Sequence, residues 1–111
     1  MADYFTAYVG FGILVGQDEF NEKFPGTFTD AGPNDTLIDS LETDLVNIIW
    51  GPENENVFIV ARGYLTNAGD WAFKIPCEQF IQTGQPLVPW FQANFPQSEP
   101  GIYMYTDYRE P

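Results

Sequence analysis

Residues 4–16 (YFTAYVGFGILVG) form an unbroken run of apolar, aromatic and small side chains, which is typical of a long β-strand. One face of this strand would carry Phe5, Ala7, Val9, Phe11, Ile13 and Val15, and the other Tyr4, Thr6, Tyr8, Gly10, Gly12 and Leu14. Gly10 and Gly12 predict a bend, a bulge or the close approach of another backbone. A phosphate-binding loop is the alternative, but the run lacks the third glycine and the lysine of known nucleotide motifs.

Two short helices are predicted in the next stretch of the chain. In residues 17–24, Phe20 and Phe24 lie four apart on one side, Asp18 can cap the helix, and a Pro-Gly pair stops it. Residues 35–43 would place Leu37, Ile38, Leu41 and Leu45 on one face and Asp35, Asp39 and Glu42 on the other. The spacing of Thr36 and Asp39 resembles a capping box that would begin this second helix.

The remaining sequence predicts strands followed by a helical region and a last strand. Residues 45–50, 56–64 and 71–75 read as a three-stranded antiparallel meander, with a turn at 67–70. Residues 77–83 and 89–95 are expected to be helical, separated by a Gly-Gln-Pro break, and 102–107 to form the final strand. The fold class is therefore α+β: one globular domain, residues 1–111, with a roughly five-stranded, mainly antiparallel sheet and two or three short helices.

Charge changes this picture from a generic small domain to a strongly acidic one. Sixteen Asp and Glu residues face four bases, Lys23, Arg62, Lys74 and Arg109, for a formal net charge of −12. Such a chain repels nucleic acid and anionic lipid, so we expect neither direct DNA or RNA binding nor membrane binding. The plainest role of the charge is solubility.

The residue types that carry most enzyme chemistry are missing. The chain has no histidine and a single cysteine, Cys77, which excludes zinc sites, Ser-His-Asp triads and Cys–His pairs. The acids lack the ligand series of a calcium-binding loop, and paired carboxylates alone are too unspecific to indicate a glycosidase. We therefore expect no enzymatic activity, no cofactor and no metal. Because there is no signal peptide and no disulfide partner for Cys77, we expect a cytoplasmic protein.

Acidic residues are concentrated between Lys23 and Arg62, an interval without any base. On a helix, Asp35, Asp39 and Glu42 would stack about 5–6 Å apart, a spacing of the same order as phosphates along a nucleic-acid strand. No Lys or Arg lies at helical spacing to offset their repulsion. A solvated helix face is the alternative. The candidate partner-binding acids are Asp35, Asp39, Glu42, Asp44, Glu53 and Glu55.

A second candidate surface lies on the final strand, where Tyr103, Tyr105 and Asp107 share one face. Exposed tyrosines are favoured anchors in protein interfaces, so Tyr103 and Tyr105 are candidate partner-binding residues. The alternative is an aromatic core in which only the hydroxyl groups reach water.

These observations lead to a non-enzymatic acidic binding protein as the first hypothesis. Its acidic face would engage a basic protein surface, and a concrete form is a small virus-encoded inhibitor that mimics nucleic acid and occupies the basic groove of a nucleic-acid-binding protein. The second hypothesis is a structural or assembly protein that forms homo-oligomers through its aromatic strand. An enzyme that works through carboxylates alone is the third.

Overall fold

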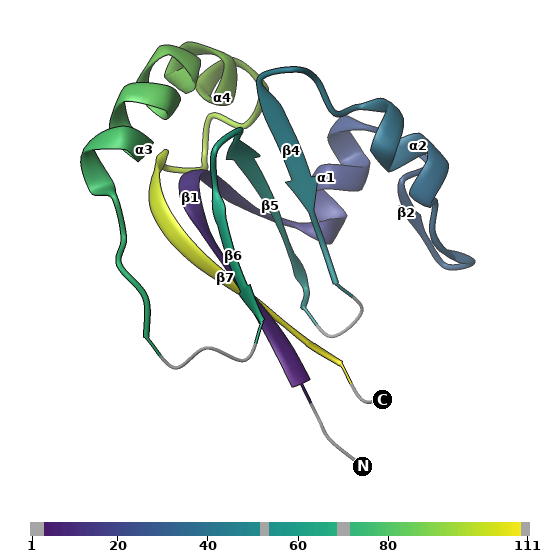
Figure 1. The fold of residues 1–111 in the computed structure, drawn as a ribbon. Helices are drawn as coiled ribbons and strands as arrows, with labels where there is room; N and C mark the ends of the chain where they lie inside the picture. The colour runs from purple at the N-terminus through teal and green to yellow at the C-terminus, as the bar shows by residue number, and fades with distance from the viewer. Residues whose placement is uncertain (1–3, 52–53, 69–71, 110–111) are drawn as a thin grey trace.

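The computed structural model describes residues 4–51, 54–68 and 72–109 (Figure 1). It confirms an α+β fold built on a five-stranded antiparallel sheet with a separate two-stranded ribbon. In chain order the elements are β1 (Tyr4–Gly16), α1 (Gln17–Lys23), β2 (Phe28–Thr29), β3 (Gly32–Pro33), α2 (Asp35–Ser40), β4 (Val46–Ile49), β5 (Asn56–Ala61), β6 (Leu65–Ala68), α3 (Cys77–Gly84), a 3-10 turn (Gln85–Leu87), α4 (Val88–Asn94) and β7 (Gly101–Arg109).

The long strand β1 organises the sheet because it pairs along both of its edges. One edge pairs with β7 from Tyr4 to Gly12. The other edge pairs first with β6, over Thr6–Val9, and then with β5, over Gly12–Gly16. β4 pairs with the far side of β5. β5 and β6 therefore lie end to end along β1, as one strand with an interruption.

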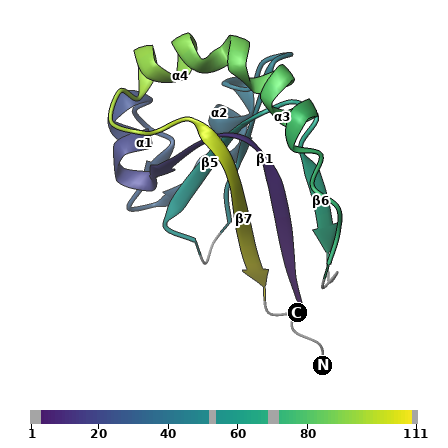
Figure 2. The same cartoon turned by 90° about the vertical axis from the view of Figure 1, so that its left-hand side faces the viewer.

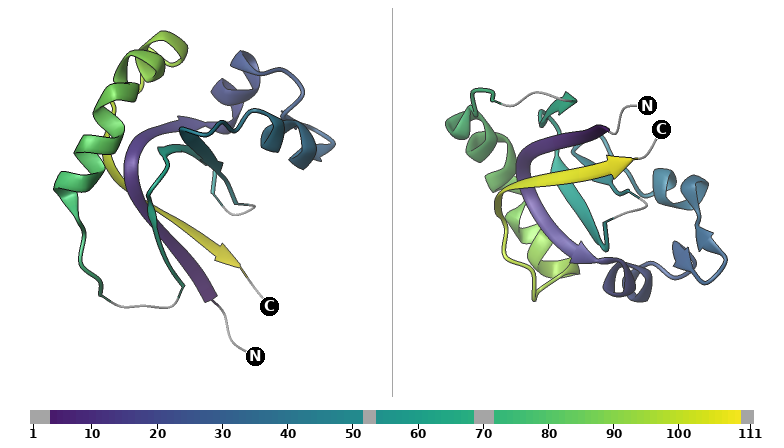
Figure 3. Two further views of the ribbon diagram at one scale, coloured as in Figure 1. Left: turned by 45° about the horizontal axis from the view of Figure 1, so that its top comes forward. Right: turned by 90° about the horizontal axis from the view of Figure 1, so that it is seen from below.

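The interruption coincides with a bend in β1, which Figure 3 shows as an arc. Gly12 lies opposite Val60, whereas Val9 lies opposite Leu65, so the partner strand has extra residues at the bend. A Cβ atom on Gly12 would lie 2.0 Å from the carbonyl oxygen of Ile59, and one on Gly10 would lie 2.6 Å from a methyl group of Val60. The prediction of a bend and a close backbone approach at these glycines is confirmed.

The bend curls the sheet until β7 meets β5 across its inner face. The rings of Tyr105 and Phe58 stack with centroids 6.0 Å apart, and the Tyr105 hydroxyl donates a 2.9 Å hydrogen bond to the Asn56 carbonyl. Nearby, the Asn54 side-chain amide donates a 3.0 Å hydrogen bond to the Thr106 carbonyl. The inner face is thus a core of its own, formed by Ile49, Phe58, Val60 and Tyr105 with Tyr8, Leu14, Tyr64 and Tyr103 packed against them.

The opposite face of the sheet is covered by helices, as Figure 2 shows for α3 and α4. Phe20 from α1 stacks on Phe95, which follows α4, with ring centroids 6.2 Å apart. This contact links α1 to the end of α4. Phe20 also packs against Phe24 at 5.1 Å, as the spacing in the sequence predicted. The buried members of this core are Ile13, Val15, Phe20, Val46, Val57, Ile59, Phe91 and Phe95.

Helix boundaries correct several predictions. α1 begins after Gly16 without a side-chain cap, so Asp18 is not its cap. α2 ends at Ser40 and is capped by Asn34, whose side-chain oxygen accepts a 3.1 Å hydrogen bond from the Leu37 N–H; the Thr36 capping box is wrong. Leu45 is 60% exposed and does not continue the buried face. The helix is shorter because the chain after it turns back to form the edge of β4.

The predicted three-stranded meander is confirmed for β4 and β5, which pair antiparallel, but its third strand is wrong. Residues 65–68, expected to lead into a turn, form β6 and pair with β1 instead. Residues 72–76 have no regular secondary structure, and Trp71 lies outside the described residues. The expected break at 84–86 is a 3-10 turn that links α3 to α4, and Pro89 occupies the first turn of α4 as predicted.

Candidate partner-binding surface

Most of the acidic residues lie in one part of the sequence, residues 17–55. α1, β2 and α2 lie together on one side of the sheet, away from α3 and from both chain ends (Figures 1 and 3). The Thr27 carbonyl accepts a 2.8 Å hydrogen bond from the Asn34 N–H, which ties the start of α2 to the segment after α1. Residues 17–55 hold ten of the sixteen acids and only one base, Lys23.

We define the acidic end by those carboxylates that the structure places around these helices. Their side chains are exposed, except that of Glu19, which is half-buried. Within the described part of the chain, none of them forms a salt bridge. The acidic end consists of Asp18, Glu19, Glu22, Asp30, Asp35, Asp39 and Glu55.

Shallow hollows connect several of these carboxylates. Asp18 and Glu55 line a hollow of about 370 Å³, together with Gly16, Gln17 and Asn56. Asp18 and Asp30 line a second hollow of about 200 Å³, next to the β2–β3 ribbon. Asp18 therefore lies between Asp30 and Glu55, and the three carboxylates belong to one continuous surface.

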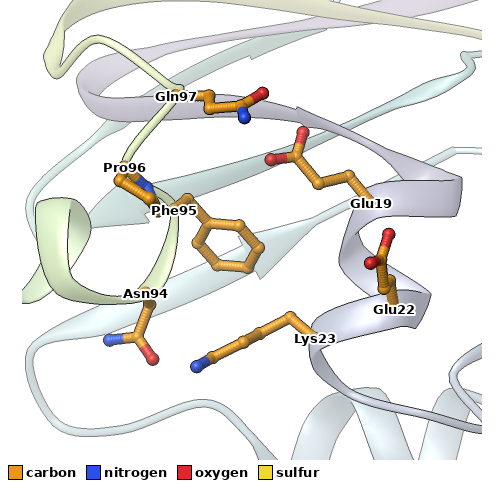
Figure 4. Close-up of a pocket in the computed structure, with 7 residues that line it drawn as sticks. All are labelled: Glu19, Glu22, Lys23, Asn94, Phe95, Pro96 and Gln97. Atoms are coloured by element: carbon orange, nitrogen blue, oxygen red, sulfur yellow. The ribbon is translucent and has the colours of Figure 1, made fainter.

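A third hollow, of about 370 Å³, lies between α1 and the segment after α4 (Figure 4). Glu19 and Glu22 form one wall, and Asn94 and Gln97 form the other. The Lys23 side chain extends toward Asn94. Lys23, the only base of residues 17–55, thus points toward the last residue of α4.

Helix electrostatics separate the acids that stabilise the fold from those that do not. Asp18 and Glu19 lie in the first turn of α1 and Asp35 in the first turn of α2, where negative charge interacts favourably with the helix dipole. Asp39 lies near the C-terminal end of α2, which has no base in its last turn. Negative charge at that end opposes the dipole. Asp39 therefore carries a charge that the local structure disfavours.

The structure places five of the six predicted acids, with different outcomes. Asp35, Asp39 and Glu55 belong to the acidic end. Asp44 is exposed, but it follows Thr43, whose carbonyl accepts a 2.9 Å hydrogen bond from the Arg62 guanidinium, so a cation lies close by. Glu53 lies outside the described residues.

Glu42 corrects the predicted helical stripe. It lies beyond the end of α2 and is half-buried. Its carboxylate accepts hydrogen bonds from the Asn47 side-chain amide and from the Ile48 N–H. Because its oxygen is used within the fold, Glu42 serves the edge of β4 and does not extend the row of Asp35 and Asp39.

The aromatic strand surface faces inward. Tyr105 is only 2% exposed, so the prediction that it contacts a partner is wrong for this conformation. Burial, reinforced by the nearby carboxylate of Asp107, raises the pKa of the Tyr105 hydroxyl. Tyr103 is half-buried, and its hydroxyl donates to the Glu99 carbonyl. This face is an aromatic core, as the alternative predicted, but the Tyr105 and Tyr103 hydroxyls donate to backbone carbonyls and do not simply reach water.

Sequence reasoning left Asp18, Glu19, Glu22 and Asp30 out of the candidate site. Lys23 separates the acids of α1 from the base-free interval that ends at Arg62, so they fall outside that interval. Counting acids in a longer window that tolerates one base would have included α1. That these acids meet Asp30 and Glu55 depends on how α1 packs, which no local pattern indicates.

Neither the described side chains nor the comparisons with known proteins give a more specific assignment. In the described ranges, no group of three or more His, Cys, Asp or Glu side chains is placed to hold a metal ion. No helix in those ranges is long and apolar enough to span a membrane. Comparisons with protein-family models, curated proteins and solved structures found no match. Fold and surface together define a small α+β domain with seven carboxylates placed around α1, α2 and the β2–β3 ribbon.

Proposed function

We propose that this protein is a non-enzymatic binding protein whose acidic end docks on a basic surface of a partner protein. The observation that carries the proposal is the set of exposed carboxylates on α1, α2 and the β2–β3 turn, without salt bridges among the described residues. Asp39 supports it most, since its charge lowers the stability of α2 and so needs a reason outside the fold.

Charge complementarity gives such a surface its specificity. A concentrated negative potential speeds encounters with a positive patch and repels proteins of like charge. Basic patches of this kind are typical of nucleic-acid-binding proteins. The partner class we propose is therefore a nucleic-acid-binding protein, and the protein acts as an inhibitor that occupies the groove in place of nucleic acid. This role places the protein in the cytoplasm, where the exposed thiol of Cys77 stays reduced.

The test is a capture experiment with a charge-matched pair of variants. The immobilised protein, the variant D30N/D39N and the variant E78Q/E99Q are exposed to lysate of the source cell, and retained proteins are identified by mass spectrometry. Glu78 and Glu99 are exposed like Asp30 and Asp39 but lie outside the acidic end, so both variants lose the same charge. A biotinylated oligolysine peptide serves as a defined basic probe.

We expect the wild type and E78Q/E99Q to retain the same basic protein, and D30N/D39N to retain less of it. Duplex DNA or RNA added to the lysate should release the retained protein, since mimic and nucleic acid compete for one groove. Equal retention by both variants would contradict the acidic end as the binding surface. If added nucleic acid does not release the retained protein, nucleic-acid mimicry is contradicted, but binding through the acidic end is not.

A further inference from the structure

The two outer strands of the five-stranded sheet differ in how their free edges are treated. On β4, the Thr43 hydroxyl accepts a hydrogen bond from the Val46 N–H, and the Glu42 carboxylate accepts one from the Ile48 N–H. Because these hydrogen bonds use the outward N–H groups of β4, another strand cannot pair with this edge. On β7 (Gly101–Arg109), the edge away from β1 has no strand partner among the described residues.

The outward backbone groups of β7 follow from one contact. The Thr106 carbonyl accepts a hydrogen bond from the Asn54 side chain, which lies on the side away from β1. In an antiparallel strand, alternate residues direct their N–H and C=O groups to the same edge. Ile102 and Met104 therefore direct theirs outward as well. Within the described ranges, nothing forms a hydrogen bond with the outward N–H and C=O groups of Ile102 and Met104.

This part of β7 lacks the features that usually protect an exposed edge. Natural edge strands are blocked by charged side chains, prolines, bulges or covering segments. Between Gly101 and Thr106 there is no charged residue and no proline, although the chain carries a net charge of −12. The Met104 side chain is 64% exposed at the centre of the open stretch. The stretch thus combines backbone groups that have no hydrogen-bond partner with an exposed apolar side chain.

We propose that β7 pairs with the β7 strand of a second copy of this chain, antiparallel about a two-fold axis at Tyr103. In this register, Ile102 of one copy lies opposite Met104 of the other, and their N–H and C=O groups bond reciprocally. Met104 then packs against Ile102 of the partner copy. This register avoids Thr106, whose carbonyl already has a partner.

The lack of charge between Gly101 and Thr106 favours a second copy of the chain over a basic peptide as the binding partner of β7. A basic peptide would meet no carboxylate between Gly101 and Thr106, whereas an identical neutral strand meets an apolar match. Because the paired stretch is short, the dimer is weak and depends on protein concentration. The proposal is independent of the acidic end and its partner.

The test compares the full chain with the variants M104E and L45E over a dilution series. Leu45 is 60% exposed and precedes β4, so L45E adds the same charge at a site remote from β7. Sedimentation velocity measures the dimer fraction, circular dichroism confirms folding, and hydrogen exchange follows the amide groups of Ile102 and Met104. We expect both amides to gain protection as the concentration rises. M104E should raise the dimer midpoint at least about tenfold, and L45E should behave as the wild type.

A wild type that stays monomeric throughout the series would overturn the proposal. So would a dimer that M104E leaves intact, or protection of both amides only when a basic peptide is added. A folded M104E that is monomeric, beside a dimeric L45E, would support pairing through β7.

Discussion

The Ile48 N–H donates a 3.1 Å hydrogen bond to the carboxylate of Glu42, across the outer edge of β4. The same carboxylate oxygen accepts a hydrogen bond from the Asn47 side chain. One acid of the most acidic region is therefore committed to the fold. Its neighbours in sequence, Asp39 and Asp44, remain exposed. This contrast separates structural acids from those available to a partner.

We predict opposite effects on stability for Glu42 and Asp39. E42A leaves the Ile48 N–H without its acceptor and should lower the free energy of unfolding by about 1–3 kcal/mol. D39N removes a charge that opposes the α2 dipole and should raise it by up to about 1 kcal/mol. Urea unfolding measures both. A loss of stability in D39N equal to that in E42A would contradict the division.

We predict that Tyr105 makes stability fall at high pH. Its pKa is raised in the folded state by burial, so the fold favours the protonated hydroxyl over the ordinary unfolded value of 10.0. The corresponding stability is fully present below pH 10 and is lost as the pH rises above it. Y105F should lose about 1 kcal/mol at neutral pH, because its hydrogen bond to Asn56 is missing, but should decline less steeply above pH 10. Equal slopes for both proteins in alkaline urea titrations would refute this role.

We predict that Gly12 and Gly16 respond differently to the same substitution. A Cβ atom on Gly12 would lie 2.0 Å from the Ile59 carbonyl oxygen, whereas one on Gly16 would meet nothing within 4 Å. G12A should therefore lower the free energy of unfolding by more than about 3 kcal/mol or prevent folding. G16A should be neutral or slightly stabilising, since alanine restricts the unfolded chain. Thermal unfolding of G16A sets the baseline, and a G12A protein of equal stability would show that the two strands do not approach closely.

We predict that salt stabilises the isolated protein. At a net charge of −12, the exposed carboxylates repel each other, and few bases offset them. Raising the ionic strength screens this repulsion, so the melting temperature should rise with added sodium chloride. The rise should be smaller for D30N/D39N than for the wild type. A melting temperature that falls with salt would indicate that attractive ion pairs dominate.

The fold was predictable where a long local pattern dominates. The run at residues 4–16 predicted β1 with its observed bounds. Phe20 and Phe24 predicted which side of α1 is buried. β6 was missed because Asn67 and Ala68 belong to a sequence typical of a turn, while pairing with β1 decides the conformation of these two residues. Long-range pairing overrode local preference in this segment.

The candidate surface was only partly predictable, for a related reason. Asp35 and Asp39 were identified because helical spacing is a local property. Glu42 was misplaced because the helix ends early, where hydrogen bonds to the β4 edge replace another turn. The orientation of β7 also depends on the curl of the sheet: Tyr105 faces the inner core and Met104 faces solvent, and strand periodicity alone does not distinguish the two faces.

The dissociation constant of the captured partner, measured at several salt concentrations for the wild type, D30N/D39N and E78Q/E99Q, tests the central claim most directly. We expect the wild-type affinity to fall steeply with salt. At low salt, D30N/D39N should bind about fivefold more weakly or worse, with a shallower salt dependence, and E78Q/E99Q should stay within about twofold of the wild type. An affinity that does not change with ionic strength, or that both variants reduce equally, would contradict binding through the acidic end.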